Sequence, residues 1–140
     1  MVSGKCEIYN YKAGKGDCIR LYYTGESGKN RNIIFDSGMT RFGPTFRKIC
    51  AEIESRQECI DALVITHVDA DHLGGLLQNL RNRVHLPITE VWMNHGTYND
   101  GDVKLSVRQC DEVYTLLTKA GINVKERIYV GSLQREGIQR

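Results

Sequence analysis

The sequence predicts an α/β (α+β) fold in which a mixed β-sheet carries its helices on one face. The first observation is a β-α-β pattern, with a strand over 32–35, an amphipathic helix over 44–56 and a nearly continuous apolar strand over 60–65. Because such a crossover joins parallel strands, part of the sheet is expected to be parallel. The second observation is a polar loop over 25–30, which predicts a hairpin leading into the strand over 32–35. With 140 residues, the chain is expected to form one domain, 1-140.

The remaining strands are predicted from short runs of apolar and aromatic residues. They are expected over residues 5–11, 18–23, 88–94 and 128–130. In the second of these runs, Cys-Ile-Arg-Leu-Tyr-Tyr, Arg20 is expected to face outward.

Three helices are expected, each with one apolar face. Pro44 suits the first turn of the first helix, which extends to about Arg56. The second helix follows the strand over 60–65 and ends near Arg83, and the third runs from a cap at Ser106 through Lys119. The residues on the three apolar faces are, in order, Phe46, Ile49, Cys50 and Ile53; Leu76, Leu77 and Leu80; and Val107, Cys110, Val113, Tyr114 and Leu117.

The strand over 60–65 ends abruptly in a cluster of polar residues. His67, Asp69, Asp71 and His72 follow it, and two glycines that permit close backbone packing come next. Imidazole and carboxylate groups together suit zinc, manganese or iron. Four such groups exceed what one tetrahedral ion needs if it keeps a position open for water. Two ions are therefore expected, with zinc as the first choice and manganese or iron as the alternatives.

The spacing of the four residues predicts how they divide between the two metals. His67 and Asp69 are one residue apart, so in an extended segment they point the same way and can share one ion. Asp71 and His72 stand where the chain turns into a helix, free to hold the second ion. Two metals about 3.5–4 Å apart would lower the pKa of a bridging water and clamp both oxygens of a hydrolysis. The alternative is that Asp69 or Asp71 only caps a helix and the histidines are incidental.

The heptapeptide Thr66-His67-Val68-Asp69-Ala70-Asp71-His72 resembles the signature of the metallo-β-lactamase superfamily, whose usual form is His-x-His-x-Asp-His. Asp69 stands where the second histidine usually does. This variant is similar to the ComEC-type branch, the hydrolase domain attached to bacterial DNA-uptake proteins. Two other segments are also similar to that branch, the turn Gly14-Lys15-Gly16-Asp17-Cys18 and the strand Ile33-Ile34-Phe35-Asp36-Ser37-Gly38. The resemblance covers residues from about 5 to 95.

This resemblance implies the N-terminal portion of a four-layer αββα sandwich, and hydrolysis of a nucleic-acid phosphodiester by a metal-bound hydroxide. In this interpretation His67 and Asp69 hold one metal, and Asp71 and His72 hold the second. Asp71 also orients the nucleophile and is the expected catalytic residue.

Two further residues are candidates for the surroundings of the site. Asp36 is expected either to support a ligand histidine from behind or only to form a turn before Gly38. His95 is expected to be a loop histidine near the site, with a role as a stand-in metal ligand as the alternative.

The family's remaining ligands would lie in a second half of the fold, and no histidine follows His95 in this sequence. Three explanations are open. The chain is the N-terminal part of a longer protein, or it is completed by another copy or another chain, or it is a reduced form that binds one metal weakly or none. Whether the chain is an enzyme therefore depends on whether the missing ligands are supplied. Two other functions stay open, a non-catalytic module acting in an oligomer or with a partner, and a hydrolase of small esters, amides or thioesters.

Composition limits the partners and the location. The net charge of +2 comes from lysines and arginines spread along the chain, so there is no basic footprint of a dedicated DNA binder. Nucleic acid enters only as the substrate that the resemblance implies. No apolar run approaches a membrane span, so a cytoplasmic protein without a membrane partner is expected. The five cysteines form no Cys-x-x-Cys pair and are expected to be mostly buried small hydrophobes.

Overall fold

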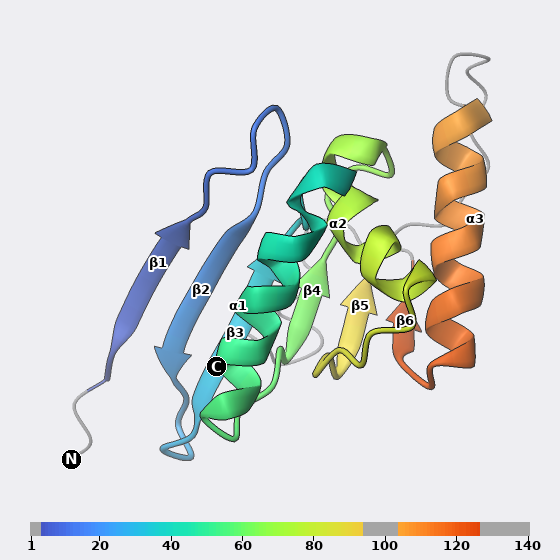
Figure 1. Cartoon of the computed structure of the whole chain (residues 1–140). Helices are drawn as coiled ribbons and strands as arrows, with labels where there is room; N and C mark the ends of the chain where they lie inside the picture. The colour runs from blue at the N-terminus through green and yellow to red at the C-terminus, as the bar shows by residue number, and fades with distance from the viewer. Residues whose placement is uncertain (1–3, 94–103, 127–140) are drawn as a thin grey trace.

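The computed structural model describes residues 4–93 and 104–126, and these residues form one twisted β-sheet with helices packed against it (Figure 1). The described part of the chain contributes six strands, in the spatial order β1-β2-β3-β4-β5-β6. Their bounds are β1 Cys6–Asn10, β2 Ile19–Thr24, β3 Asn30–Phe35, β4 Ala62–Val64, β5 Glu90–Trp92 and β6 Asn123–Lys125.

The sheet is mixed, as predicted. Strands β1, β2 and β3 pair antiparallel, and β3, β4, β5 and β6 pair parallel. The change of direction falls at β3, where the hairpins end and the first crossover helix begins. The carboxyl ends of β3, β4 and β5 therefore meet at the same edge of the sheet as the start of β2.

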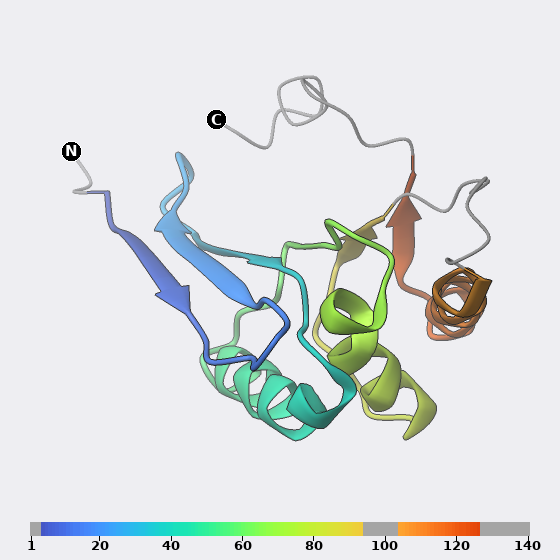
Figure 2. The same ribbon diagram turned by 90° about the horizontal axis from the view of Figure 1, so that it is seen from above.

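The helices cover one face of this sheet. They are α1 Gly43–Ser55, α2 Ala70–Arg81 and α3 Lys104–Lys119, with a short 3-10 helix, η1 Thr40–Phe42, leading into α1. Figure 2 shows α1 and α2 side by side under the sheet, with α3 next to β6 at its edge. This arrangement confirms the predicted helices on one face.

The main core lies between the helices and the sheet. Phe46 and Ile53 of α1 and Leu76 of α2 are fully buried against Ile34 and Leu63 of the central strands. Three cysteines belong to the same core, and burial raises the pKa of the Cys18 and Cys50 thiols to about 12 and that of Cys110 to about 11. Such thiols are protonated and inert, which agrees with their predicted role as small hydrophobes.

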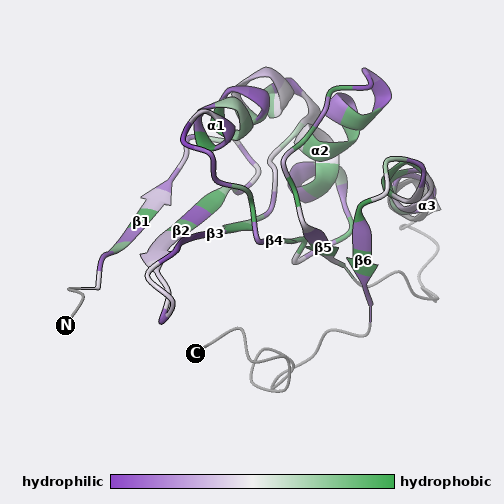
Figure 3. Cartoon of the chain, turned by 90° about the horizontal axis from the view of Figure 1, so that it is seen from below, coloured by the Kyte–Doolittle hydropathy of each residue, from purple (hydrophilic) through white to green (hydrophobic). Residues whose placement is uncertain are grey.

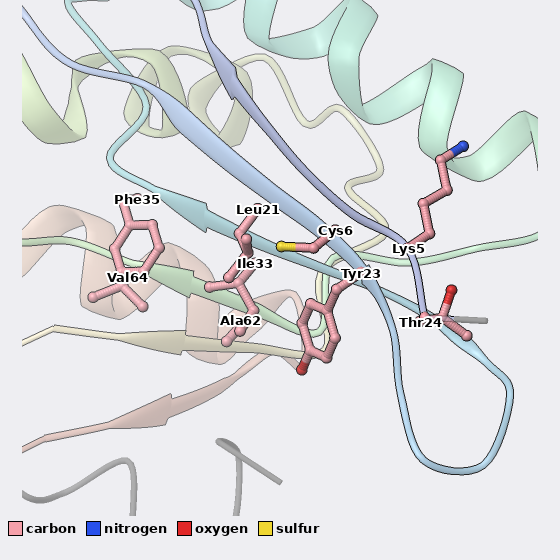
Figure 4. A pocket seen from close by; sticks show the side chains of 10 residues that line it. Lys5, Cys6, Leu21, Tyr23, Thr24, Ile33, Phe35, Ala62 and Val64 are labelled. Carbon is pink, nitrogen blue, oxygen red and sulfur yellow. The ribbon is translucent and has the colours of Figure 1, made fainter. Parts of the chain in front are cut away.

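The opposite face of the sheet carries no helix of the described chain. Figure 3 shows the sheet edge-on, with α1 and α2 on one side of it. The strand registers place a row of apolar residues on the uncovered face, in which Ile8 lies opposite Leu21, Leu21 opposite Ile33 and Ile33 opposite Ala62. Leu21, Ile33 and Ala62 of this row, with Phe35 and Val64, line an apolar groove of about 810 Å³ (Figure 4). We call this surface the open face.

Four expectations about the elements need correction. Arg20 does not face outward: it is 2% exposed and lies on the helix-covered face of β2. Residues 40–42, for which no element was predicted, form η1, and α3 begins at Lys104, two residues before the predicted cap Ser106. Tyr114 was placed on the apolar face of α3 but is 37% exposed. The structure also adds β6 at 123–125, which was not predicted, whereas the strand expected over 128–130 lies outside the described residues.

No helix within the described residues is long and apolar enough to cross a membrane.

Candidate metal centre

The predicted site residues lie at one edge of the sheet, between the carboxyl ends of β3 and β4 and the first turn of α2. Asp36 follows β3, the segment from Thr66 follows β4, and Asp69 to His72 open α2. Residues that are 30 or more positions apart in the chain therefore share one small volume.

Asp36 is the buried centre of this arrangement. Its backbone has a φ of 65°, and its N–H donates to the carbonyl of Val64 over 2.8 Å. Asp is among the residues that tolerate this left-handed conformation. Thr66 donates two hydrogen bonds to the Asp36 carboxylate. Its backbone N–H donates to Oδ1 over 2.7 Å, and its hydroxyl donates to Oδ2 over 2.6 Å. Asp36 thus joins the ends of the two parallel strands β3 and β4.

His72 stands on the other side of the same carboxylate. Its Nδ1 lies 3.0 Å from Asp36 Oδ2, and its Nε2 lies 3.7 Å from Asp69 Oδ1. Burial lowers the pKa of His72, but the carboxylates of Asp36, Asp69 and Asp17 outweigh it and hold that pKa above its ordinary value. The contact between Nδ1 and Asp36 is an ion pair when His72 is protonated.

His67 reaches the site from the segment after β4. Its Nδ1 lies 3.0 Å from the hydroxyl of Thr66. Its ring packs against that of His72 with the centroids 4.8 Å apart and the planes tilted by 39°. The two histidines of the motif are therefore neighbours, although the sequence analysis assigned them to different metals.

Asp69 is the N-cap of α2, because its Oδ1 accepts a hydrogen bond from the Asp71 backbone N–H over 3.1 Å. This is the helix cap of the simpler interpretation. The cap does not exclude the other role, since the same oxygen faces His72 Nε2. Asp71 lies in the first turn of α2, where its negative charge also favours the helix N-terminus.

The two glycines of α2 allow the close approach that was predicted for them. A Cβ on Gly75 would lie 2.1 Å from the carbonyl oxygen of Ser37, and one on Gly74 would lie 2.4 Å from the backbone nitrogen of Thr40. Ser37 also donates to the carbonyl of His72 through its backbone N–H, over 2.7 Å, and through its hydroxyl, over 3.0 Å. Backbone contact between the start of α2 and the segment after β3 thus fixes the position of His72.

Asp17 is a residue that the sequence analysis quoted but did not assign to the site. Its backbone carbonyl accepts from Gly38 N–H over 2.9 Å, and a Cβ on the preceding Gly16 would lie 2.1 Å from the carbonyl oxygen of Asp71. Asp17, Asp36 and His72 each bring one ligand atom to within 4.8 Å of the others. The Gly-x-Gly-Asp turn was the signal that could have placed Asp17 here.

The donor set fits a divalent metal ion. It combines imidazole and carboxylate groups, the mixture that zinc, manganese and iron accept. Because Nδ1 of His72 faces Asp36, its Nε2, which lies 3.7 Å from Asp69 Oδ1, is the nitrogen available to a metal. The described residues do not bring His67, Asp69 and Asp71 into the group within 4.8 Å. Their division between two metals stays a prediction, and His95 lies outside the described residues.

Comparison with known proteins gives one family. The sequence profile of the metallo-beta-lactamase superfamily matches residues 18–108, which is more than half of the chain. No curated protein matches.

Among solved structures, a candidate metallo-beta-lactamase from Thermotoga maritima is 13% identical with a TM-score of 0.44, over 88% of this chain and 58% of its own length. A metallo-beta-lactamase from Cronobacter sakazakii with a HARLDQ motif is 18% identical with a TM-score of 0.36, over 63% of this chain and 30% of that one. A mutant of that motif is 19% identical with a TM-score of 0.38, over 68% and 35%. The chain thus spans 58% or less of the length of these structures.

Proposed function

The chain belongs to the metallo-beta-lactamase superfamily, and from this premise we propose that it acts in metal-dependent hydrolysis at the edge of the sheet where α2 begins. One observation carries most of the proposal: Asp17, Asp36 and His72 converge from three separate segments to within 4.8 Å. A helix cap alone would need one carboxylate there, not a set of carboxylates around two contacting histidines.

The residues divide into those that hold the metal and those that hold the ligands. Because the His67 and His72 rings are in contact, we replace the division predicted from the sequence and assign His67, Asp69 and His72 as ligands of one ion, with Asp17 and Asp71 as the additional carboxylates available to a second ion. Asp36 is assigned to the support of His72, because its Oδ2 lies 3.0 Å from His72 Nδ1 while Thr66 donates to both of its oxygens. A bound divalent cation supplies Lewis acidity, which lowers the pKa of water and stabilises negative charge on substrate oxygens.

Asp71 retains the catalytic role proposed from the sequence. In this role the Asp71 carboxylate orients the attacking water and accepts its proton at one oxygen. Its place in the first turn of α2, beside the cap Asp69, supports this assignment because the turn projects toward the same edge of the sheet.

For the substrate we propose a phosphodiester, on the resemblance of the His-x-Asp-x-Asp-His motif to the ComEC-type branch. The further ligands of the family would come from a second half in a longer chain, from a second copy or from a partner chain.

The test is zinc content together with hydrolysis of bis(p-nitrophenyl) phosphate by the full chain. We expect about one or two zinc ions per chain, and loss of both metal and hydrolysis in His72→Ala. His85→Ala is the matched control, because the His85 side chain is 79% exposed and pairs only with Glu54 among the described residues.

Each other outcome corrects the proposal in a different way. Zinc binding without phosphodiester hydrolysis, but with cleavage of a thioester or ester, would replace the substrate. Absence of zinc from the unaltered chain would support the non-catalytic module instead.

A further inference from the structure

Thr66 is the residue between β4 and the motif, and its hydroxyl touches two members of the site at once. The hydroxyl lies 2.6 Å from Asp36 Oδ2 and 3.0 Å from His67 Nδ1. Its backbone N–H holds the other oxygen of Asp36 over 2.7 Å.

The number of protons available decides the direction of both contacts. An ionised carboxylate only accepts hydrogen bonds, so the contact with Asp36 uses the one proton that the hydroxyl can donate. The hydroxyl must then accept from His67, and the proton of that contact must be on Nδ1. In the neutral imidazole the other nitrogen, Nε2, consequently carries the free lone pair that can bind a metal.

The same oxygen of Asp36 also lies 3.0 Å from His72 Nδ1. One carboxylate therefore faces both histidines of the motif, His72 directly and His67 through the hydroxyl. Because the two rings are in contact at 4.8 Å, an error in the orientation of one ring would displace the other.

We propose that Thr66 is a positioning residue whose hydroxyl transmits the orientation of Asp36 to His67 and fixes His67 as the Nδ1–H tautomer. This tautomer presents Nε2 of His67 for metal binding, so that consequence of the inference rests on the proposed function. The tautomer itself does not, because it is a property of the metal-free protein.

The first measurement is the tautomer of His67 in the metal-free chain, read from its ring ¹⁵N chemical shifts. The expected result is Nδ1–H in the unaltered protein and in Thr66→Ser, which keeps the hydroxyl, and a loss of this preference in Thr66→Val. Thr118→Val is the matched control, since its hydroxyl bonds to the Tyr114 carbonyl on α3 and lies away from the site. An Nε2–H tautomer in the unaltered protein would overturn the proposal without any variant.

The second measurement is zinc affinity, by competition with a chelating indicator. Loss of a group that orients a ligand histidine typically weakens metal binding by about 10–100-fold, and we expect a loss in this range for Thr66→Val but not for Thr66→Ser or Thr118→Val. An unchanged tautomer and affinity in a folded Thr66→Val variant would overturn the proposal. If the unaltered chain binds no zinc but His67 is the Nδ1–H tautomer, the proposed function fails and the positioning role of Thr66 stands.

Discussion

The two faces of the sheet differ in what covers them, although the same strands supply both. On the helix-covered face Ile34 and Leu63 are fully buried, whereas on the open face exposure rises from 7% at Ile33 to 71% at Ile8 on the edge strand β1. Strand β2 shows the contrast within one segment: its charged residue, Arg20, lies under the helices, and its neighbour Leu21 lies on the open face. The polarity of a side chain therefore did not decide its face in this strand.

Arg20 can be buried because specific partners surround it. Its Nε donates to Asn32 Oδ1 over 2.8 Å, and its guanidinium lies 5.3 Å from the Tyr9 ring centroid and 5.1 Å from that of Tyr22. Asn32 in turn donates to Glu58 over 3.2 Å. The covered face thus contains a polar network in which Arg20 Nη2 faces aromatic rings rather than a hydrogen-bond acceptor, whereas no helix of the described residues covers the apolar groove of the open face.

We expect the helix-covered face to contribute more to the free energy of unfolding than the open face. Alanine substitutions of one phenylalanine on each face test this expectation. Phe46→Ala, on the fully buried side, is expected to lower the free energy of unfolding by about 3–5 kcal/mol. Phe35→Ala, on the open face, is expected to cost clearly less because its side chain is only partly buried. Urea unfolding of the two variants measures the difference, and equal losses would show that the open face is as well packed as the covered one.

The buried network is the next test. Arg20→Ala is expected to lower the free energy of unfolding by about 2–3 kcal/mol, because it leaves the Asn32 oxygen without its charged donor. Arg31→Ala is the control: the Arg31 side chain is 41% exposed in its pair with Asp61, and exposed pairs contribute about 0.2–1 kcal/mol. A loss of the same size in both variants would contradict the special role of the covered network.

The pH dependence of stability tests the contribution of Glu58, which accepts from Asn32 in this network. Burial raises the pKa of Glu58, but hydrogen bonds from Asn32, Asn30 and Tyr22 outweigh it and hold that pKa below its ordinary value. A lowered pKa in the folded state means that the carboxylate stabilises the fold above the unfolded pKa of about 4.3. This contribution is lost as the pH falls through the folded pKa.

Melting temperatures between pH 5 and pH 3 therefore should fall less steeply in Glu58→Gln than in the unaltered chain. Glu26→Gln, an exposed change in the loop between β2 and β3, is expected to keep the unaltered slope. Parallel slopes for Glu58→Gln and the unaltered protein would count against the network as the cause.

The smallest effect on stability is expected at the edge of the open face. Ile8→Lys should change the free energy of unfolding by less than about 0.5 kcal/mol, because the side chain is already 71% exposed. It should, however, reduce binding of an apolar fluorescent dye, since it places a charge beside the groove. Unchanged dye binding would mean that the groove, which Cys6 of β1 lines, ends before Ile8.

The sequence predicted the fold best where one periodicity dominated. The four apolar residues of α1 and the three leucines of α2 are all buried, and the crossover between β3 and β4 is parallel. The prediction was wrong for Arg20 because alternation along a strand cannot tell which face the helices will cover. The three-residue strand β6 was missed because its residues, Asn123 to Lys125, carry only a single valine.

The sequence predicted which residues of the motif lie near one another, but it did not predict which residues from other segments join them. Spacing along the chain could place His67, Asp69, Asp71 and His72 together, since they are local neighbours. It could not show that Asp17 and Asp36 come to His72 from other strands, because these contacts depend on the pairing of β2, β3 and β4.

The backbone contacts of the glycines around α2 have a consequence for mutational scanning. At Gly16 and Gly75 even the smallest side chain would meet a carbonyl oxygen at 2.1 Å. A saturation library scored only by activity would therefore rank these positions with the proposed metal ligands, although glycine has no side chain that could bind a metal. A parallel score for protein abundance is expected to separate the two groups, since a side chain at these glycines clashes with the backbone of the fold itself.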